Sequence, residues 1–136
     1  MMPRPFRLTP VDPIESDRQS DIVNYLRHDP RVSVVLRVNG GGRKFGQGWV
    51  WFYRLFVRGL DPMDGKGCSD LLVQLRGGWL AAFEVKRPGE KETAEQAEFL
   101  AAVAAGGGLS ARVETWQQVK VEIDAYLRKQ QDVVVR

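Results

Sequence analysis

The sequence predicts a single α/β domain in which a mixed β-sheet is flanked by helices. The chain has 136 residues and a mass of 15.4 kDa, which is the size of one ordinary domain. Hydrophobic residues make up 43% and charged residues 27%, values that exclude disordered and fibrous proteins. Segments with helical spacing alternate with short apolar runs in the order α-β-β-β-β-α-β-α, and this order predicts the mixed sheet.

The first half of the chain is expected to contain one helix and two strands. Asp12 as N-cap, Pro13 at the first helical position and Glu15 at the third predict where the helix begins. His28 is expected to cap its end, next to a proline that stops it. The expected segments, in chain order, are an extended arm (residues 1–11), the helix (12–29), a strand (32–38), a glycine-rich loop (39–48), a strand (49–57) and a second loop (59–67).

The second half is expected to begin with a β-hairpin whose turn contains Arg76, Gly77 and Gly78. Thr93 and Gln96 have the spacing of a helix capping box, and Gly106 predicts where that helix stops. The expected segments are two strands (71–75 and 79–86), a helix (93–106), a strand (109–115), a helix (116–129) and a C-terminal tail (130–136). Residues 12–129 thus form the predicted domain.

The charge distribution and the composition limit which kinds of functional site the chain can form. The net charge is +3, with a balance of +5 over residues 1–60 and −2 over residues 61–136, which suits a polyanion held near acidic metal ligands. A single cysteine, Cys68, and a single histidine, His28, exclude an internal disulfide, a cysteine-rich zinc site and most histidine-based sites. We find no secretory signal and no apolar run near the roughly 20 residues that span a bilayer, so we expect a cytoplasmic protein.

The number of residues in the hairpin turn determines whether Asp70 and Glu84 lie on the same face of the sheet. A two-residue turn would pair Asp70 with Val85 and send Asp70 and Glu84 to opposite faces of the sheet. A three-residue turn pairs Asp70 with Glu84, with Cβ atoms about 4.5–5.5 Å apart. That register also collects the apolar residues on the other face: Leu71, Val73, Leu75, Trp79, Ala81, Phe83 and Val85. We therefore expect an odd-length turn or a bulge.

Residues two apart on a strand share a face, so Glu84 and Lys86 are expected to point to the same side. Burying both charges is costly unless the carboxylate has a cation to bind. Two neighbouring carboxylates, Asp70 and Glu84, can share one hard divalent cation, which points to Mg²⁺ or Mn²⁺. The alternatives are an exposed Glu84–Lys86 ion pair and an Asp70 that only caps a turn.

Five short motifs occur in an order and spacing that are typical of one protein family. They are Glu15-x-x-x-Gln19, Gly67-x-Ser69-Asp70, Glu84-Val85-Lys86-Arg87-Pro88-Gly89, Gln96-x-x-Phe99 and Gly106-Gly107. Over about residues 12–127 the chain resembles the VRR-Nuc (virus-type replication-repair nuclease) branch of the PD-(D/E)XK nuclease superfamily. It departs from the superfamily pattern at Ser69, where proline is usual. The resemblance implies a restriction-endonuclease-like fold.

The resemblance also implies residue roles. Asp70, Glu84 and the backbone carbonyl of Val85 would bind the metal, and Lys86 would position or deprotonate the attacking water. Glu15 would be an additional acid, Gln96 would orient Lys86 or the water, and Gln19 and Ser69 would support the site. Glu15 and Gln96 also fit capping boxes, which is the alternative explanation for both.

DNA contacts are expected from Arg43 and Lys44 in the glycine-rich loop and from Arg87 beside the site, although an ordinary solvated loop would look the same. The aromatic residues of segment 49–56 have no assigned role; a subunit interface, stacking on unpaired bases and the core all remain open.

The expected function is a Mg²⁺- or Mn²⁺-dependent DNA nuclease. The resemblance implies that it leaves 5′-phosphate and 3′-hydroxyl ends. By the resemblance it would cut branched DNA such as a Holliday junction, as a homodimer, in a bacterium or a phage-infected cell. One alternative is a flap nuclease or exonuclease subunit that works with a helicase. Another is a DNA-binding module without catalysis.

Overall fold

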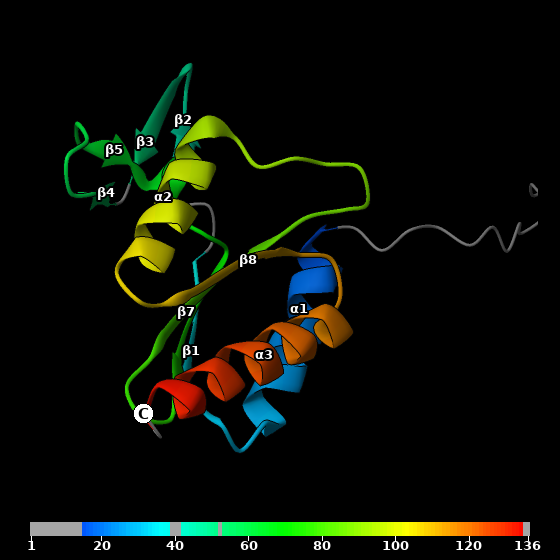
Figure 1. The fold of residues 1–136 in the computed structure, drawn as a ribbon. Coiled ribbons are helices and arrows are strands. Elements are labelled where there is room, and N and C mark those ends of the chain that lie inside the picture. The colour runs from blue at the N-terminus through cyan, green and yellow to red at the C-terminus, as the bar shows by residue number, and fades with distance from the viewer. Residues whose placement is uncertain (1–14, 39–41, 52, 135–136) are drawn as a thin grey trace, which may run out of the picture.

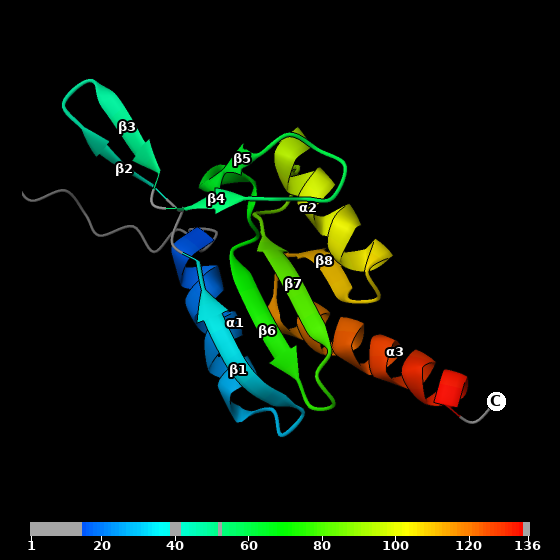
Figure 2. The same ribbon diagram turned by 90° about the vertical axis from the view of Figure 1, so that its left-hand side faces the viewer.

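The computed structural model describes residues 15–38, 42–51 and 53–134 (Figure 1). Four strands form the main sheet in the order β1-β6-β7-β8 (Figure 2). They are β1 (Val32–Arg37), β6 (Leu71–Leu75), β7 (Leu80–Val85) and β8 (Leu109–Val113). Only the β7–β8 pair is parallel, so the sheet is mixed as predicted.

Three helices cover the two faces of this sheet. Helices α1 (Glu15–His28) and α3 (Trp116–Val134) pack on one face, and α2 (Ala94–Ala105) lies on the other face, over β7 and β8 (Figure 2). The core lies between the sheet and the pair α1 and α3. Its fully buried side chains include Ile22, Leu26, Leu71, Val73, Leu75, Ala81, Phe83, Val85, Val113, Val119 and Ile123. This fold confirms a small α/β domain.

The β6–β7 hairpin has the three-residue turn that the apolar pattern predicts. Leu71 pairs with Phe83 across the hairpin, so the next residues outward, Asp70 and Glu84, lie opposite each other. The turn closes with a hydrogen bond of 2.8 Å from the Leu75 amide to the Trp79 carbonyl. Gly77 and Gly78 have φ values of 96° and 88°, a left-handed conformation that glycine adopts without steric cost.

Residues 42–67 differ from the expectation. A glycine-rich loop was expected up to residue 48, but strands β2 (Gly42–Phe45) and β3 (Gly48–Trp51) form a separate hairpin. The single strand expected over 49–57 is divided, because β3 ends at Trp51 and the next strand is the short β4 (Arg54–Leu55), which pairs with β5 (Met63–Asp64). Neither β3 nor β4 joins the main sheet. A short 3₁₀ helix, η1 (Gly65–Gly67), follows. Alternating apolar residues predict a strand but not its partner.

The helix ends follow the capping signals. The His28 ring donates through Nδ1 to the Asn24 carbonyl at 2.7 Å, at the end of α1 as expected. Thr93 and Gln96 form the predicted capping box of α2, which ends before Gly106. The structure continues α3 to Val134, five residues beyond the predicted end. The expected start signals Asp12 and Pro13 lie outside the described residues. Among those described, no helix has the length and apolar character for crossing a bilayer.

An ion-pair network fastens the end of α1 to α3. Asp29 is buried and accepts hydrogen bonds of 2.8 Å from both Arg31 and the Tyr25 hydroxyl. Arg31 also contacts Asp124 on α3. The hydrogen bonds from the Arg31 guanidinium hold the pKa of Asp29 well below its usual range, although burial opposes this. The Asp29 carboxylate therefore stabilises the folded state only while it is ionised.

We expect Asp29→Ala to lower the free energy of unfolding by about 2 kcal/mol, because the substitution removes the hydrogen bonds that Arg31 and Tyr25 donate to the buried carboxylate, although Arg31 keeps Asp124. The wild type should also lose stability as the pH falls below the unfolded-state pKa of Asp29, 3.8, since the pKa is lower in the folded state. Urea denaturation at several pH values measures both effects. Asp17→Ala, at an exposed position on α1, is the control; equal losses in the two variants would contradict the prediction.

Candidate metal centre

Two carboxyl groups meet at one end of the β6–β7 hairpin. Asp70 immediately precedes β6, and Glu84 is the penultimate residue of β7 on the face covered by α2. Glu84 is completely buried, and Asp70 is partly buried. Asp70 Oδ2 accepts a hydrogen bond of 2.8 Å from the Val85 amide. The two carboxyl groups lie close enough for each to shift the pKa of the other.

The two oxygens of Glu84 have different surroundings. Oε1 accepts a hydrogen bond of 2.8 Å from Gln96 Nε2 and lies 3.5 Å from Lys86 Nζ. Oε2 is buried and has no hydrogen-bond partner among the described residues. Because a buried, unpaired acceptor is costly, such an atom is expected to bind a proton or a cation.

The pKa values of the two carboxyl groups also indicate that the pair binds a proton or a cation. Burial, with the neighbouring Asp70 in second place, raises the pKa of Glu84 to about 8 against the opposing effect of Lys86. Burial also raises the pKa of Asp70, although the Val85 amide and nearby positive charges favour its ionised form. In the absence of a cation, the pair therefore retains a proton near neutral pH.

The residues fit a Mg²⁺ or Mn²⁺ ion. Mg²⁺ is usually bound by one or two carboxylates and keeps several waters, so Asp70 and Glu84 with the unpartnered Oε2 are a suitable donor set. No group of three or more His, Cys, Asp or Glu residues arranged for a metal occurs in residues 15–38, 42–51 and 53–134. The expected third acid, Glu15, begins α1, but its side chain lies outside the description. Val85 contacts Asp70 through its amide, and a ligand role for its carbonyl stays a prediction.

Gln96 combines the two roles that the sequence left as alternatives. Its Oε1 accepts from the Thr93 amide at 2.9 Å, and its backbone amide donates to Thr93 Oγ1 at 3.2 Å, which completes the capping box. Its Nε2 donates to Glu84. This hydrogen bond goes to the carboxylate and not to Lys86, and the expected role of Gln96 in orienting Lys86 or the water stays a prediction. One amide group thus ties the start of α2 to the carboxylate pair.

Gln19 and Ser69 lie one step away from the carboxylates. Gln19 is buried and accepts a hydrogen bond of 3.1 Å from Arg37 Nε, and the charge of Arg37 lowers the pKa of Asp70. Ser69 is buried and donates through Oγ to the Leu71 carbonyl at 3.1 Å, which holds the turn just before β6. Both contacts position Asp70 indirectly.

Sequence reasoning missed two arginines near the site. Arg37 interrupts the apolar strand β1 at its last residue, and this change of residue type was the available signal. Arg112 lies opposite Glu84 on β8 and donates to the carbonyls of Arg87 (2.9 Å) and Glu90. Arg112 therefore fastens the segment that follows Lys86, and only the pairing of β7 with β8 reveals this.

Tyr53 and Cys68 lie beside the carboxylates. Burial, together with its contact to Cys68, raises the pKa of Tyr53 to about 12, and the charge of Asp70 adds to the shift. Burial likewise raises the pKa of the Cys68 thiol, and both acidic side chains contribute. Cys68 is thus an un-ionised side chain next to the site, and Tyr53 is a neighbour that the sequence did not single out.

The predicted DNA-contacting residues lie apart from one another. Arg43 and Lys44 are exposed on β2, not in a loop, and their hairpin extends away from the main sheet (Figure 2). The Arg43 guanidinium lies 5.1 Å from the Phe45 ring centroid. Arg87 is half-exposed, and its Nε lies 3.9 Å from Glu90 Oε1. The structure brings Arg87 near the carboxylates, because it directly follows Lys86.

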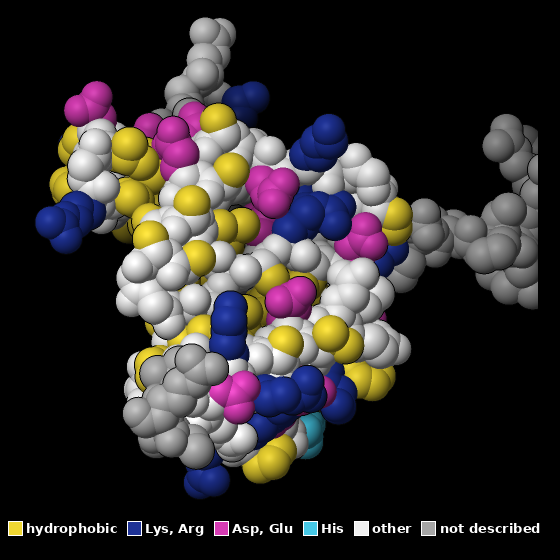
Figure 3. All heavy atoms as spheres, viewed as in Figure 1, with side chains coloured by type: hydrophobic (Ala, Val, Ile, Leu, Met, Phe, Trp, Pro, Cys, Tyr) yellow, Lys and Arg dark blue, Asp and Glu magenta, His cyan; other side chains and the backbone are white. Residues whose placement is uncertain are grey.

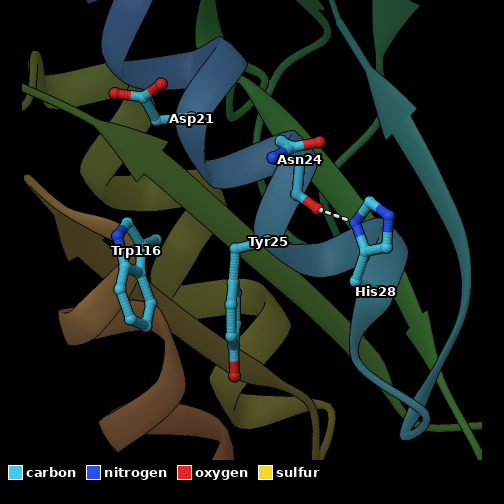
Figure 4. Close-up of a pocket in the computed structure, with 5 residues that line it drawn as sticks. All are labelled: Asp21, Asn24, Tyr25, His28 and Trp116. Carbon is cyan, nitrogen blue, oxygen red and sulfur yellow. Dashed lines mark hydrogen bonds between the residues drawn. The ribbon is translucent and has the colours of Figure 1, made fainter.

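A separate hollow lies between α1 and the start of α3 (Figure 4). Both helices pack on the face of the sheet opposite Glu84. Tyr25 and Trp116 stack there with ring centroids 5.1 Å apart. The Tyr25 hydroxyl is bonded to Asp29, and the His28 ring is bonded to a backbone carbonyl. The ring stack joins α1 to α3, and both polar groups already have partners in or beside α1, so the carboxylate pair is the better candidate site.

Comparisons of the chain with protein-family models, with curated proteins and with solved structures each returned no match.

We expect the stability of the metal-free protein to fall as the pH rises from about 4.5 to about 8, because folded Glu84 keeps a proton that the unfolded chain releases. The slope should be up to about 1.4 kcal/mol per pH unit. Glu84→Gln should remove this slope and be at least as stable as the wild type at pH 8. Thermal unfolding in EDTA measures the effect.

Thermal unfolding in the presence of Mg²⁺ tests whether the carboxylate pair binds a cation. Since metal and proton compete for the carboxylates, Mg²⁺ should raise the melting temperature of the wild type more at pH 8 than at pH 6 and should not affect Glu84→Gln. Glu98→Gln, an exposed position on α2, should behave as the wild type. An unchanged pH slope in Glu84→Gln would contradict the raised pKa.

The double role of Gln96 can be separated by a matched pair of variants. Gln96→Met removes the donor to Glu84 together with one capping bond, whereas Thr93→Ala removes only the capping hydroxyl. Both should weaken the helix, Thr93→Ala by about 1 kcal/mol. Only Gln96→Met should weaken Mn²⁺ binding, by about tenfold, as measured by calorimetry. Equal losses of affinity would show that Gln96 acts only as a cap.

Proposed function

We propose that the protein is a Mg²⁺- or Mn²⁺-dependent DNA nuclease that hydrolyses phosphodiester bonds. The observation that supports this most strongly is that Glu84, fully buried beside Asp70 and with its Oε1 3.5 Å from Lys86 Nζ, has a second carboxylate oxygen, Oε2, that lacks a partner among the described residues. Two acids and one amine are the groups needed to cleave an anionic ester without histidine.

The surrounding residues have distinct tasks in this proposal. A bound Mg²⁺ or Mn²⁺ supplies positive charge and lowers the pKa of a water molecule. The Val85 amide and Gln96 hold Asp70 and Glu84 in fixed orientations, so the ligand oxygens need not reorganise during the reaction. Lys86, buried and 3.5 Å from Glu84, is placed to orient the water or to stabilise the charge that develops on the phosphate.

The choice of DNA, and of branched DNA cut by a homodimer, rests on the resemblance to VRR-Nuc nucleases and their restriction-endonuclease-like fold. The mixed sheet with flanking helices is compatible with that fold. The net charge of +3 is also compatible with a polyanionic substrate. Acidic and basic side chains are interspersed on the face drawn in Figure 3, so the proposal does not depend on a broad basic patch there.

We expect metal-dependent cleavage of four-way junction, 5′-flap or duplex DNA, abolished by EDTA. Asp70→Asn and Lys86→Ala should each lower the rate at least about 100-fold, because the first removes a charged ligand of the metal and the second removes the positive charge that stabilises the transition state. Asp61→Asn, an exposed aspartate, is the control. Gel assays with each substrate measure the rates.

The outcomes separate the alternatives. Cleavage that persists in EDTA, or that is equal in Asp70→Asn, would contradict the nuclease proposal. DNA binding without any cleavage would favour a non-catalytic module. A preference for flaps, or for free ends, over the junction would correct the substrate and leave the chemistry in place.

A further inference from the structure

A groove lies on the same face of the sheet as Glu84, between α2 and the segment that follows β4. Its volume is about 520 Å³, within the range of about 300–1,000 Å³ in which proteins hold small organic groups. Most of its lining is apolar or glycine. The side chains that matter here are Phe56, Arg58, Leu80, Phe99 and Val103.

The groove is aligned with the carboxylate pair along one strand. Leu80 begins β7 and Glu84 lies four residues further on, so both side chains point to the same face. At about 3.3 Å per residue, the separation along the strand is about 13 Å. A stacked nucleic-acid strand advances about 3.4 Å per nucleotide, so one strand can reach both places within about four nucleotides.

The exposed groups in the groove suit a nucleobase. Phe56 is 77% exposed and Leu80 is 46% exposed, so two apolar surfaces face the groove without cover from the described residues. Arg58 is exposed and takes part in none of the ion pairs of the described residues. An aromatic ring beside a guanidinium provides a stacking surface for a base and a positive charge for its phosphate.

We propose that this groove binds an unpaired nucleobase of the same DNA strand whose phosphate lies at the carboxylate pair. The inference rests on the proposed nuclease function and specifies its substrate class as DNA with an unpaired segment within about four nucleotides of the cleaved bond. A base inside a duplex is stacked on both faces, so it cannot offer a face to Phe56 unless it leaves the stack. The groove thereby gives a role to Phe99 and to part of the aromatic segment 49–56.

The test measures DNA binding in EDTA, where cleavage cannot interfere. The probes are a single-stranded oligothymidine, a blunt duplex of the same length, and a single strand that carries 2-aminopurine, whose fluorescence is quenched by stacking. The wild type should bind the single strand more tightly than the duplex and should quench 2-aminopurine. Phe56→Ala should weaken single-strand binding about tenfold, leave duplex binding unchanged and abolish the quenching.

Val121→Ala is the matched control, because Val121 is 64% exposed on α3, on the other side of the sheet. It should bind all probes as the wild type does. Both variants replace exposed side chains, and equal melting temperatures would verify that they are folded. No quenching by the wild type, or equal weakening of single-strand and duplex binding in Phe56→Ala, would overturn the proposal.

Three further outcomes distinguish the base-binding proposal from the nuclease proposal. If Phe56→Ala, but not Val121→Ala, converts a dimer into a monomer, the groove is an interface between copies of the chain and the base-binding proposal is wrong. Metal-dependent cleavage without quenching that depends on Phe56 would overturn the groove and leave the nuclease proposal intact. Quenching that depends on Phe56 without cleavage would support the groove and reject the nuclease.

Discussion

The burial of two carboxyl groups side by side is the constraint on which the rest of the site depends. Asp70 and Glu84 would repel each other if both were ionised, and little water reaches them to screen that repulsion. The fold supplies part of the compensation through the Val85 amide, Gln96 and Lys86. It leaves Glu84 Oε2 uncompensated, so a polar contact needed there must come from a proton or a ligand. A purely structural ion pair would not require a second acid at the same place.

The geometry of this pair is set at the opposite end of the hairpin. A turn one residue shorter would shift the register and move Glu84 to the face that packs against α1 and α3. Gly77 and Gly78 permit the longer turn because both adopt positive φ, and a Cβ on Gly77 would also lie 3.0 Å from Trp79 Nε1. Two glycines far from the chemistry therefore determine whether the acids meet. The apolar residues of β6 and β7 reinforce the same register, since only that pairing buries them together.

This agreement explains what the sequence could predict. The main-sheet strands and the three helices follow from apolar spacing and capping residues, and the Asp70–Glu84 pairing follows from hairpin parity. Residues 42–67 were mispredicted because alternation marks a strand but does not say which edge it joins. Arg112 could not be found because its importance comes from a parallel neighbour 28 positions away in sequence. The capping role of Gln96 was predicted, but its contact with Glu84 was not. A capping box uses the side-chain oxygen of the glutamine and does not indicate which residue its Nε2 contacts.

The helices cover the two faces of the sheet unequally, and this explains how the carboxylate pair can be shielded from water and still be accessible to a ligand. Helices α1 and α3 seal one face, whereas α2 covers the other face only over β7 and β8. On β1, Val34 and Leu36 therefore remain 56% and 55% exposed on the α2 side. The carboxylate pair lies at the boundary: Glu84 is beneath α2 and fully buried, and Asp70, one strand closer to the open side, is only partly so. A ligand that approaches across the open half would meet Asp70 first. Glu84 lies in a low-dielectric environment, which would strengthen its attraction for a cation if one were bound there.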